Sequence, residues 1–232
     1  LGADASVASL QAKVASRPRW HAVHLACHGL VNMERPRLSS LALSLFAVSA
    51  YADDYSRGMD AYFAGRFKTA VKLLKPAAEA GNALAQYQLG VMYDAGQGVH
   101  QNSLAALAWY RAAAESDPRA QVAMADRLME GRGIAHDPPA AISWYRKAAA
   151  QANLTALLGL AIAYRDGQGV PQDIVLAHVF ASIRVRQWGK LDLAERDKIS
   201  KELAAQMTAE QRTESEALQL QGMAALTDLP LS

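Results

Sequence analysis

The chain repeats itself with a period of 35 to 36 residues. Three segments, 85–109, 120–144 and 156–180, align over their whole length. A Gly-x-Gly triplet marks the register in each of them: Gly96/Gly98, Gly131/Gly133 and Gly167/Gly169. Self-similarity with a period of about 20 to 50 residues indicates stacked supersecondary units, none of which can bury its apolar face without its neighbours.

Each unit is predicted to consist of a helix, a glycine loop and a second helix. In residues 83–116 the apolar side chains before Gly96 have helical spacing, and glycine readily accepts the left-handed conformation that ends a helix. The second helix would begin after Asn102, whose side-chain oxygen can accept from the free amides of the first turn. Asp137 and Asp173 stand at the same place in the next two units.

Alanine, glycine and aromatic positions recur most regularly. The first copy reads Ala85-x-x-x-Leu89-Gly90-x-x-Tyr93-x-x-Gly96-x-Gly98-Val99, followed by Ala106-x-x-Trp109-Tyr110-x-x-Ala113-Ala114. This pattern resembles the Sel-one-like repeat, a relative of the tetratricopeptide repeat, over residues 55–222. The resemblance implies an all-α fold, a right-handed α-solenoid of antiparallel helix pairs. It also implies protein–protein interaction rather than catalysis.

The repeat pattern divides the chain. We expect a degenerate first repeat over residues 53–81, three repeats over 82–190, and a helical C-terminal cap and tail over 191–232. Within the cap, residues 192–207 and 209–221 are predicted helices, and Thr208 is placed to cap the second of them.

The segment 33–52 reads as a secretory signal peptide. Met33 opens a short basic stretch with Arg35 and Arg37, and an apolar run follows over residues 41–48. A small-x-small cleavage site ends at Ala52. The apolar run is shorter than the roughly 20 residues that span a bilayer, so an ordinary buried helix is the alternative. Cleavage after Ala52 would make the protein periplasmic or secreted, whereas retention of residues 1–52 would leave it cytoplasmic.

Residues 1–45 carry a second resemblance. The stretch Trp20-His-Ala-Val-His-Leu-Ala-Cys-His28-Gly29 is similar to the histidine strand of CHAT domains, which are relatives of caspases. That family implies His28 as general base, with a cysteine nucleophile on a later strand. The chain's single cysteine is Cys27, next to His28, and neighbouring strand residues point to opposite faces. We therefore expect residues 1–32 to be an inert fragment or an over-extended N-terminus, disordered and outside the functional unit.

Charge and composition exclude several functions. The formal net charge is +2, of which residues 1–52 hold +3, so residues 53–232 carry −1. Nucleic-acid binding requires a clustered basic surface and is not expected. Residues 53–232 contain no cysteine, so packing rather than disulfides would hold an exported chain together.

No motif predicts a cofactor, a metal or a catalytic centre. A phosphate loop follows a strand, whereas these Gly-x-Gly triplets follow helices and recur periodically. His100, His136 and His178 are scattered over three units without metal-ligand spacing and are expected to face solvent or lie in loops. The chain is therefore not expected to be an enzyme. The alternative is a hydrolase, either a remnant of a CHAT-like peptidase or a cell-wall enzyme with an unidentified carboxylate pair.

Function is expected where the repeats differ. Stacked helix pairs form a long concave groove, and positions on the first helix of each unit would line it. We predict a groove for a protein or peptide partner at nine such positions: Tyr87, Val91, Asp94, Val122, Asp126, Met129, Leu158, Ile162 and Arg165. The expected role is that of a scaffold, adaptor or regulator of the bacterial envelope, without a membrane span after signal cleavage. The oligomeric state and the partner are left open.

Overall fold

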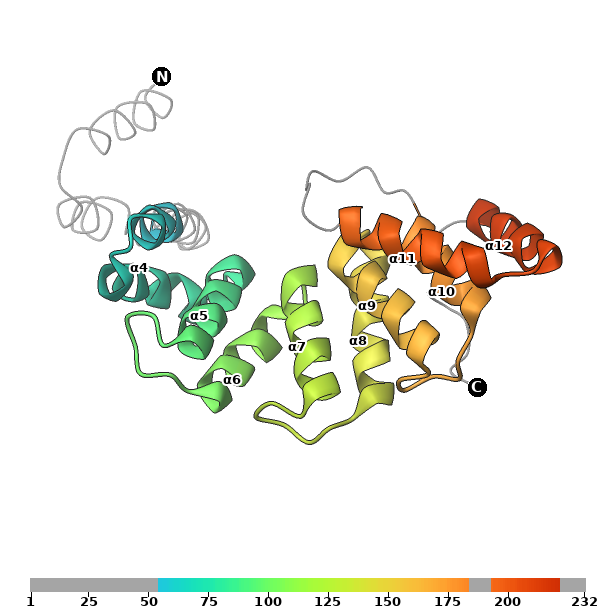
Figure 1. The fold of residues 1–232 in the computed structure, drawn as a ribbon. Helices are drawn as coiled ribbons and strands as arrows, with labels where there is room; N and C mark the ends of the chain where they lie inside the picture. Colours follow the sequence, from blue (N-terminus) through green and yellow to red (C-terminus); the bar gives the residue numbers. More distant parts are fainter. Residues whose placement is uncertain (1–53, 184–192, 222–232) are drawn as a thin grey trace, which may run out of the picture. The chain divides into compact units, whose positions relative to one another are not determined.

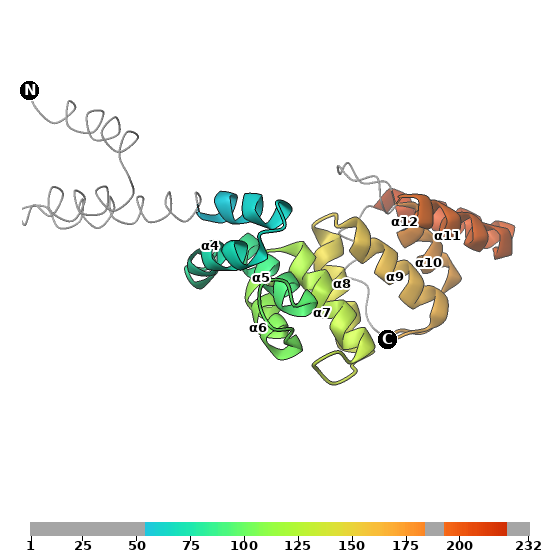
Figure 2. The same ribbon diagram turned by 60° about the vertical axis from the view of Figure 1, so that its left-hand side comes forward.

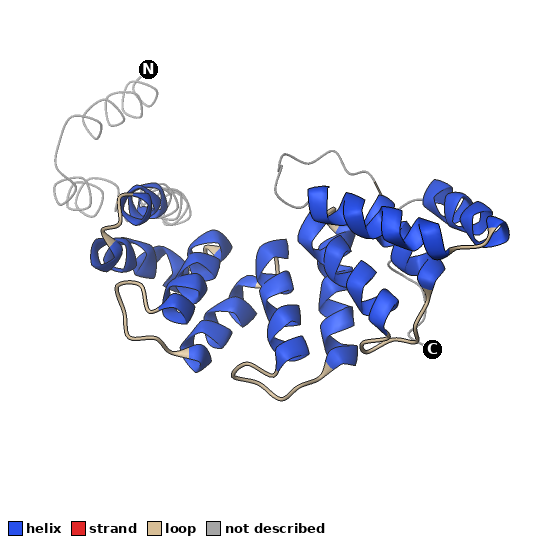
Figure 3. Ribbon diagram, viewed as in Figure 1, coloured by secondary structure: helices blue, strands red, loops and turns tan. Residues whose placement is uncertain are grey.

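The computed structural model describes residues 54–183 and 193–221, and within these ranges the chain forms helices and loops without strands (Figure 3). The predicted all-α solenoid is confirmed. Residues 54–63 form a helix before the labelled elements. The helices that follow are α4 (Phe67–Glu79), α5 (Ala83–Ala95), α6 (Ser103–Ala113), α7 (Pro118–Glu130), α8 (Pro138–Ala150), α9 (Leu154–Asp166), α10 (Ile174–Ser182), α11 (Leu193–Gln206) and α12 (Ala209–Gln221).

Helices pack mainly on their neighbours in sequence. The pairs α5/α6, α7/α8 and α9/α10 are the predicted units, and α4/α5, α6/α7 and α8/α9 join one unit to the next (Figure 1). Helix α10 differs because it contacts α9, α11 and α12. The short loops return the chain after each helix, so neighbouring helices run antiparallel.

The end of the first helix and the start of the second helix in each unit are capped as the sequence predicts. Gly96, Gly131 and Gly167 adopt the left-handed conformation after α5, α7 and α9, with φ of 67°, 70° and 69°. The Asn102 side chain accepts from the amides of Leu104 and Ala105 at the start of α6. The equivalent residues Asp137 and Asp173 cap α8 and α10 in the same way.

A second set of caps, at the start of the first helix of each unit, was not predicted. The side chains of Asn82, Asp117 and Asn153 accept from backbone amides of α5, α7 and α9. Their spacings, 35 and 36 residues, are those of the repeat. Asp117 is also buried and forms an ion pair with Arg119 at 2.7 Å.

The second glycine of each triplet contacts the previous unit. A Cβ at Gly98 would lie 2.5 Å from the carbonyl carbon of Phe67, the first residue of α4. A Cβ at Gly169 would lie 2.5 Å from the same atom of Pro138, at the start of α8. The loop backbone of one unit therefore packs against the N-terminus of a helix in the unit before it, and only glycine fits there.

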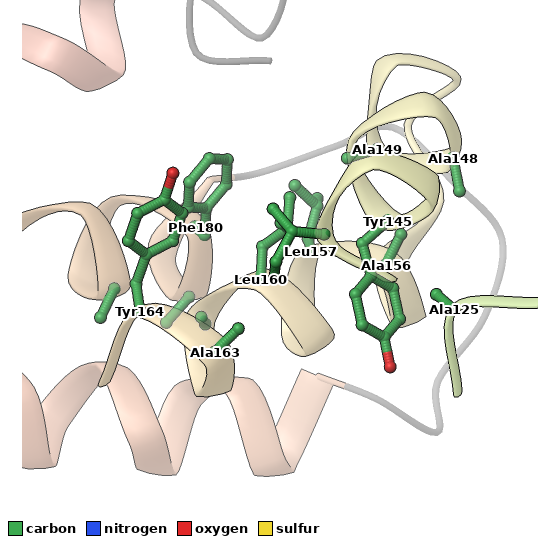
Figure 4. Close-up of a cluster of buried hydrophobic side chains, with 14 of the residues drawn as sticks. Ala125, Tyr145, Ala148, Ala149, Ala156, Leu157, Leu160, Ala163, Tyr164 and Phe180 are labelled. Atoms are coloured by element: carbon green, nitrogen blue, oxygen red, sulfur yellow. The ribbon is translucent and has the colours of Figure 1, made fainter. Parts of the chain in front are cut away.

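Alanine and glycine let the helices approach, and aromatic rings fill the remaining space. Tyr145 lies against Gly159, and Tyr110 lies against Gly90. Tyr164 and Phe180 stack between α9 and α10 with ring centroids 5.6 Å apart (Figure 4). Tyr110, Tyr145 and Tyr164 are buried, whereas the recurring Trp109 and Trp144 are half-buried.

The C-terminal helices close the array at α10. Figure 2 shows α11 beside α10, and the buried Arg196 of α11 donates to the carbonyls of Phe180 and Ile183 at the end of α10. The predicted cap at Thr208 is confirmed. Its hydroxyl accepts from the amide of Gln211, and the Gln211 side chain accepts from the amide of Thr208. This reciprocal pair is a capping box.

The exposure of one of the three histidines differs from what the sequence predicts. His100 and His136 are exposed as expected, but His178 is half-buried between α10 and α12. Its Nδ1 is hydrogen-bonded to the hydroxyl of Ser215, at 2.8 Å, and Ser215 is fully buried. Gln219 of α12 donates to the hydroxyls of both Ser182 and Ser215. The prediction failed because periodicity within one unit cannot show that α12 covers α10.

We expect the attachment of α12 to weaken below about pH 6.5, where an ordinary histidine is protonated. Burial lowers the pKa of His178, the neighbouring Arg212 lowers it further, and Glu216 opposes both. The unfolded chain therefore binds more protons than the folded chain in this range, so stability is lost as the pH falls. The melting temperature should decrease more between about pH 7.5 and about pH 5.5 in the parent than in His178→Gln. The exposed His136→Gln should behave like the parent, and an unchanged pH dependence in His178→Gln would contradict this reading.

Candidate partner-binding face

The nine predicted groove positions lie on α5, α7 and α9, the first helices of successive units. All are half-buried except Val122, which is buried at 7% exposure. We call this set the first-helix face. Nothing in the arrangement tests whether a partner occupies it, so its role as a groove stays a prediction.

The apolar members of the first-helix face are anchored in the core. Tyr87 and Val91 pack on the cluster around α6 and α7. Met129, Leu158 and Ile162 pack on the cluster that runs through α7, α8, α9 and α10. Each of these five side chains keeps part of its surface exposed. The face therefore offers apolar area on a rigid support, which is the kind of surface that protein interfaces use.

Two polar members hold neighbouring helices together. Asp94 of α5 forms an ion pair with Arg127 of α7, whose side chain is 3% exposed. The Arg127 guanidinium also lies over the Tyr110 ring, 5.1 Å from its centroid, and donates to the carbonyl of Arg132. Asp94 is therefore the counter-ion of a buried cation as well as a surface residue.

Asp126 likewise belongs to the first-helix face and also bonds to a neighbouring helix. Its carboxylate accepts a 2.5 Å hydrogen bond from the Tyr145 hydroxyl, across the α7/α8 pair. Burial raises the pKa of Asp126, and the hydrogen bond from Tyr145 opposes that shift. Burial together with this carboxylate raises the pKa of Tyr145. This hydrogen bond ties α7 to α8.

Two arginines, one on the first-helix face and one beside it, are also engaged. Arg165 pairs with Asp166 at 2.7 Å on the surface, and this hydrogen bond lowers the pKa of Asp166. Arg119 lies over the Tyr87 ring, with its guanidinium carbon 4.5 Å from the centroid. Sequence reasoning missed Arg119 and Arg127, because neither type recurs at its position in the other units.

Other predicted sites receive no support. His28 and Cys27, the CHAT-like segment and the signal peptide lie outside the described residues. Residues 54–183 and 193–221 contain no group of three or more metal-type side chains. No helix in these ranges is both long enough and apolar enough to cross a membrane.

The comparisons with known proteins agree on the repeat. The family pattern described as the Sel1 repeat matches residues 61–82, 83–117, 118–153 and 154–181. None of the comparisons supports the CHAT-like resemblance of residues 1–45. A search of curated proteins found no match.

Two solved structures are similar to the chain. One is c5321, a protective antigen present in uropathogenic Escherichia coli strains and displaying an SLR fold. It is 32% identical with a TM-score of 0.55, over 61% of this chain and 32% of that protein. The other is a Sel1 repeat protein from Oxalobacter formigenes, 30% identical with a TM-score of 0.52, over 56% of this chain and 52% of that protein.

The present chain thus spans about a third and about half of the lengths of these two relatives. The matched repeats occupy residues 61–181 without a break, which is more than half of its 232 residues. The chain belongs to the Sel1 repeat family.

Proposed function

We propose that the chain is a scaffold or adaptor of the bacterial envelope that binds an extended segment of a partner protein along the first-helix face. Sel1 repeat proteins generally mediate protein–protein interaction, and their fold is typically a non-catalytic scaffold. The observation that carries the proposal is the set of half-exposed apolar side chains that the first helices of three consecutive units contribute to this face, namely Tyr87, Val91, Met129, Leu158 and Ile162.

The chemistry of the face favours a protein segment over a small polar ligand. Its apolar side chains are spaced along successive helices, so an extended chain could contact several units at once. Its carboxylates are already engaged within the repeats, Asp94 by Arg127 and Asp126 by Tyr145. Shape and apolar contact would therefore dominate recognition.

The experiment that tests the face uses photo-crosslinking, because truncating half-buried side chains would also alter stability. A photoreactive phenylalanine is placed at Met129 on the first-helix face, or at Ala112 on the exposed side of α6 as the matched control. The full chain is irradiated in cells that produce it, and adducts are separated by mass. We expect discrete adducts from position 129 and none of the same mass from position 112. Identical adduct patterns at the two positions would reject the face.

We further propose that the protein reaches the envelope by export, because the basic stretch, apolar run and small-x-small site of residues 33–52 have the order of a secretory signal. N-terminal sequencing of the cellular protein should then begin at Asp53. Recovery of an N-terminus upstream of Met33 would reject export by this signal, and it would leave the binding face untouched.

A further inference from the structure

Helix α4 carries a row of basic side chains on its outer face. Lys68, Lys72 and Lys75 are spaced four and three residues apart, so they lie on one side of the helix, and Arg66 immediately precedes α4. All four are exposed. We call these four residues the α4 basic stripe. The opposite side of α4 is buried in the repeat array through Ala70, Leu74, Ala77 and Ala78.

The α4 basic stripe is held in one orientation, and most of its positive charge is not paired with acidic side chains. Because the apolar side of α4 is committed to the core, the helix cannot turn its cations inward. Lys75 has a loose ion pair with Glu79, at 3.8 Å between two side chains that are each more than half exposed. Within the part of the chain that the structure describes, no acid pairs with Arg66, Lys68 or Lys72.

An exposed aromatic side chain stands beside the stripe. Phe63 is 79% exposed, the second most exposed of the large apolar residues in the described ranges. The rings of Phe63 and Tyr62 meet edge to face with their centroids 5.7 Å apart, and the ring of Tyr62 meets that of Phe67, the first residue of α4, with a centroid separation of 5.5 Å. Phe63 is therefore supported by an aromatic row that leads directly to the stripe.

We propose that the α4 basic stripe and Phe63 bind the surface of a bilayer that contains anionic lipids. Clustered lysine and arginine attract anionic headgroups, and an exposed phenylalanine inserts among them. The outer side of a single helix is convex, which suits contact with an extended surface rather than the enclosure of a peptide.

The stripe would be a weak, reversible and salt-sensitive contact. Each cation near an anionic surface strengthens binding by about fivefold at moderate ionic strength. Dissolved salt screens this attraction, which is largely lost beyond a Debye length of about 10 Å at 0.1 M salt. A contact of this kind would orient the repeat array at the membrane without anchoring it permanently. It does not depend on the first-helix face, which lies on other helices.

The test is co-sedimentation of the full chain with vesicles. Vesicles of phosphatidylcholine alone are compared with vesicles that also contain phosphatidylglycerol, at low and at high salt. We expect phosphatidylglycerol to increase the bound fraction at low salt, and high salt to abolish that increase. The triple variant Lys68→Gln/Lys72→Gln/Lys75→Gln should weaken the phosphatidylglycerol-dependent binding by roughly a hundredfold, about fivefold for each charge. Phe63→Ser should weaken it severalfold.

A matched variant controls for net charge. Arg111→Gln/Lys198→Gln/Lys201→Gln removes the same number of exposed cations from α6 and α11 and should bind as the parent does. Because every variant is made in the full chain, any contribution of residues 1–53 is common to all of them, and circular dichroism checks their helicity. Equal binding to the two vesicle types, or equal losses in the two triple variants, would overturn the proposal. Binding of polyglutamate without binding of phosphatidylglycerol vesicles would overturn it in favour of an acidic protein partner.

Discussion

Replacing Gly98 by alanine is expected to destabilise the array severely. Gly98 has a φ of +76°, which costs any other residue about 1 to 2 kcal/mol. The new Cβ would lie 2.5 Å from the carbonyl carbon and 2.6 Å from the carbonyl oxygen of Phe67. Backbone atoms at the start of α4 cannot yield as a flexible side chain could, so we expect a total loss of roughly 3 to 5 kcal/mol in the free energy of unfolding.

Two other glycines distinguish the cost of the left-handed backbone conformation from the cost of the close contact between units. Gly65 has a similar φ, +71°, but no atom within 4 Å of a built Cβ, so Gly65→Ala should cost only about 1 kcal/mol. Gly133 is intermediate, because its nearest neighbour is the Cβ of Ser103 at 3.3 Å. Urea unfolding monitored by circular dichroism would rank the variants. Equal losses in Gly98→Ala and Gly65→Ala would show that the contact between units is not what requires glycine.

Removing Asp94 is expected to be the most damaging change on the first-helix face. Arg127 is 2% exposed, and Asp94→Ala would leave its guanidinium buried with only the Arg132 carbonyl and the Tyr110 ring as partners. Breaking one side of a buried ion pair costs about 3 to 5 kcal/mol. Asp94 itself is 32% exposed and water can reach the site, so we expect a loss near the lower end, about 3 kcal/mol.

The repeat supplies the compensating substitution. The residue equivalent to Arg127 in the preceding unit is Met92, which is fully buried. Arg127→Met should therefore pack acceptably and cost about 1 kcal/mol or less. The double variant Asp94→Ala/Arg127→Met should be more stable than Asp94→Ala alone, since it no longer holds an unpaired charge. Additive losses in the double-mutant cycle, measured by urea unfolding, would show that the pair is not coupled.

Periodicity predicted the local structure of the repeats in considerable detail. The glycine caps after α5, α7 and α9 and the polar caps before α6, α8 and α10 follow from residue types at fixed offsets. The capping box at Thr208 follows from the same chemistry. The caps at Asn82, Asp117 and Asn153 obey the same offsets and could have been found by the same reasoning. Local rules suffice here because a cap depends only on residues within one turn.

Contacts between units could not be predicted in this way. The sequence places Gly98 and Gly169 in the glycine loops, but only the structure shows that close contact with a helix in the previous unit requires glycine there. Arg127 and His178 each occupy a position where the other repeats carry a different residue, so no pattern marked them. Their partners lie on other helices, and sequence spacing alone does not show which side chains will meet across a helix junction.

The first-helix face combines a feature that the sequence predicts with one that it does not. Repetition correctly placed its nine positions on the same three helices, and the structure adds that two of its charged residues also stabilise the fold. Loss of binding in Asp94 or Asp126 variants would therefore be ambiguous, because the same substitutions disturb Arg127 or Tyr145. Crosslinking at Met129 avoids this ambiguity because it leaves Asp94 and Asp126 in place, and with them their partners Arg127 and Tyr145.

The neighbour-to-neighbour packing of the helices makes the length of this protein adjustable. A unit of 35 or 36 residues packs mainly on the unit before it and the unit after it, through junctions such as α6/α7 and α8/α9. Inserting or deleting one whole unit between two others would preserve every type of contact that remains. The two solved relatives extend well beyond the matched region. An array of this kind can thus vary in length without a new fold, provided that α11 and α12, the helices that pack on α10, are kept at its end.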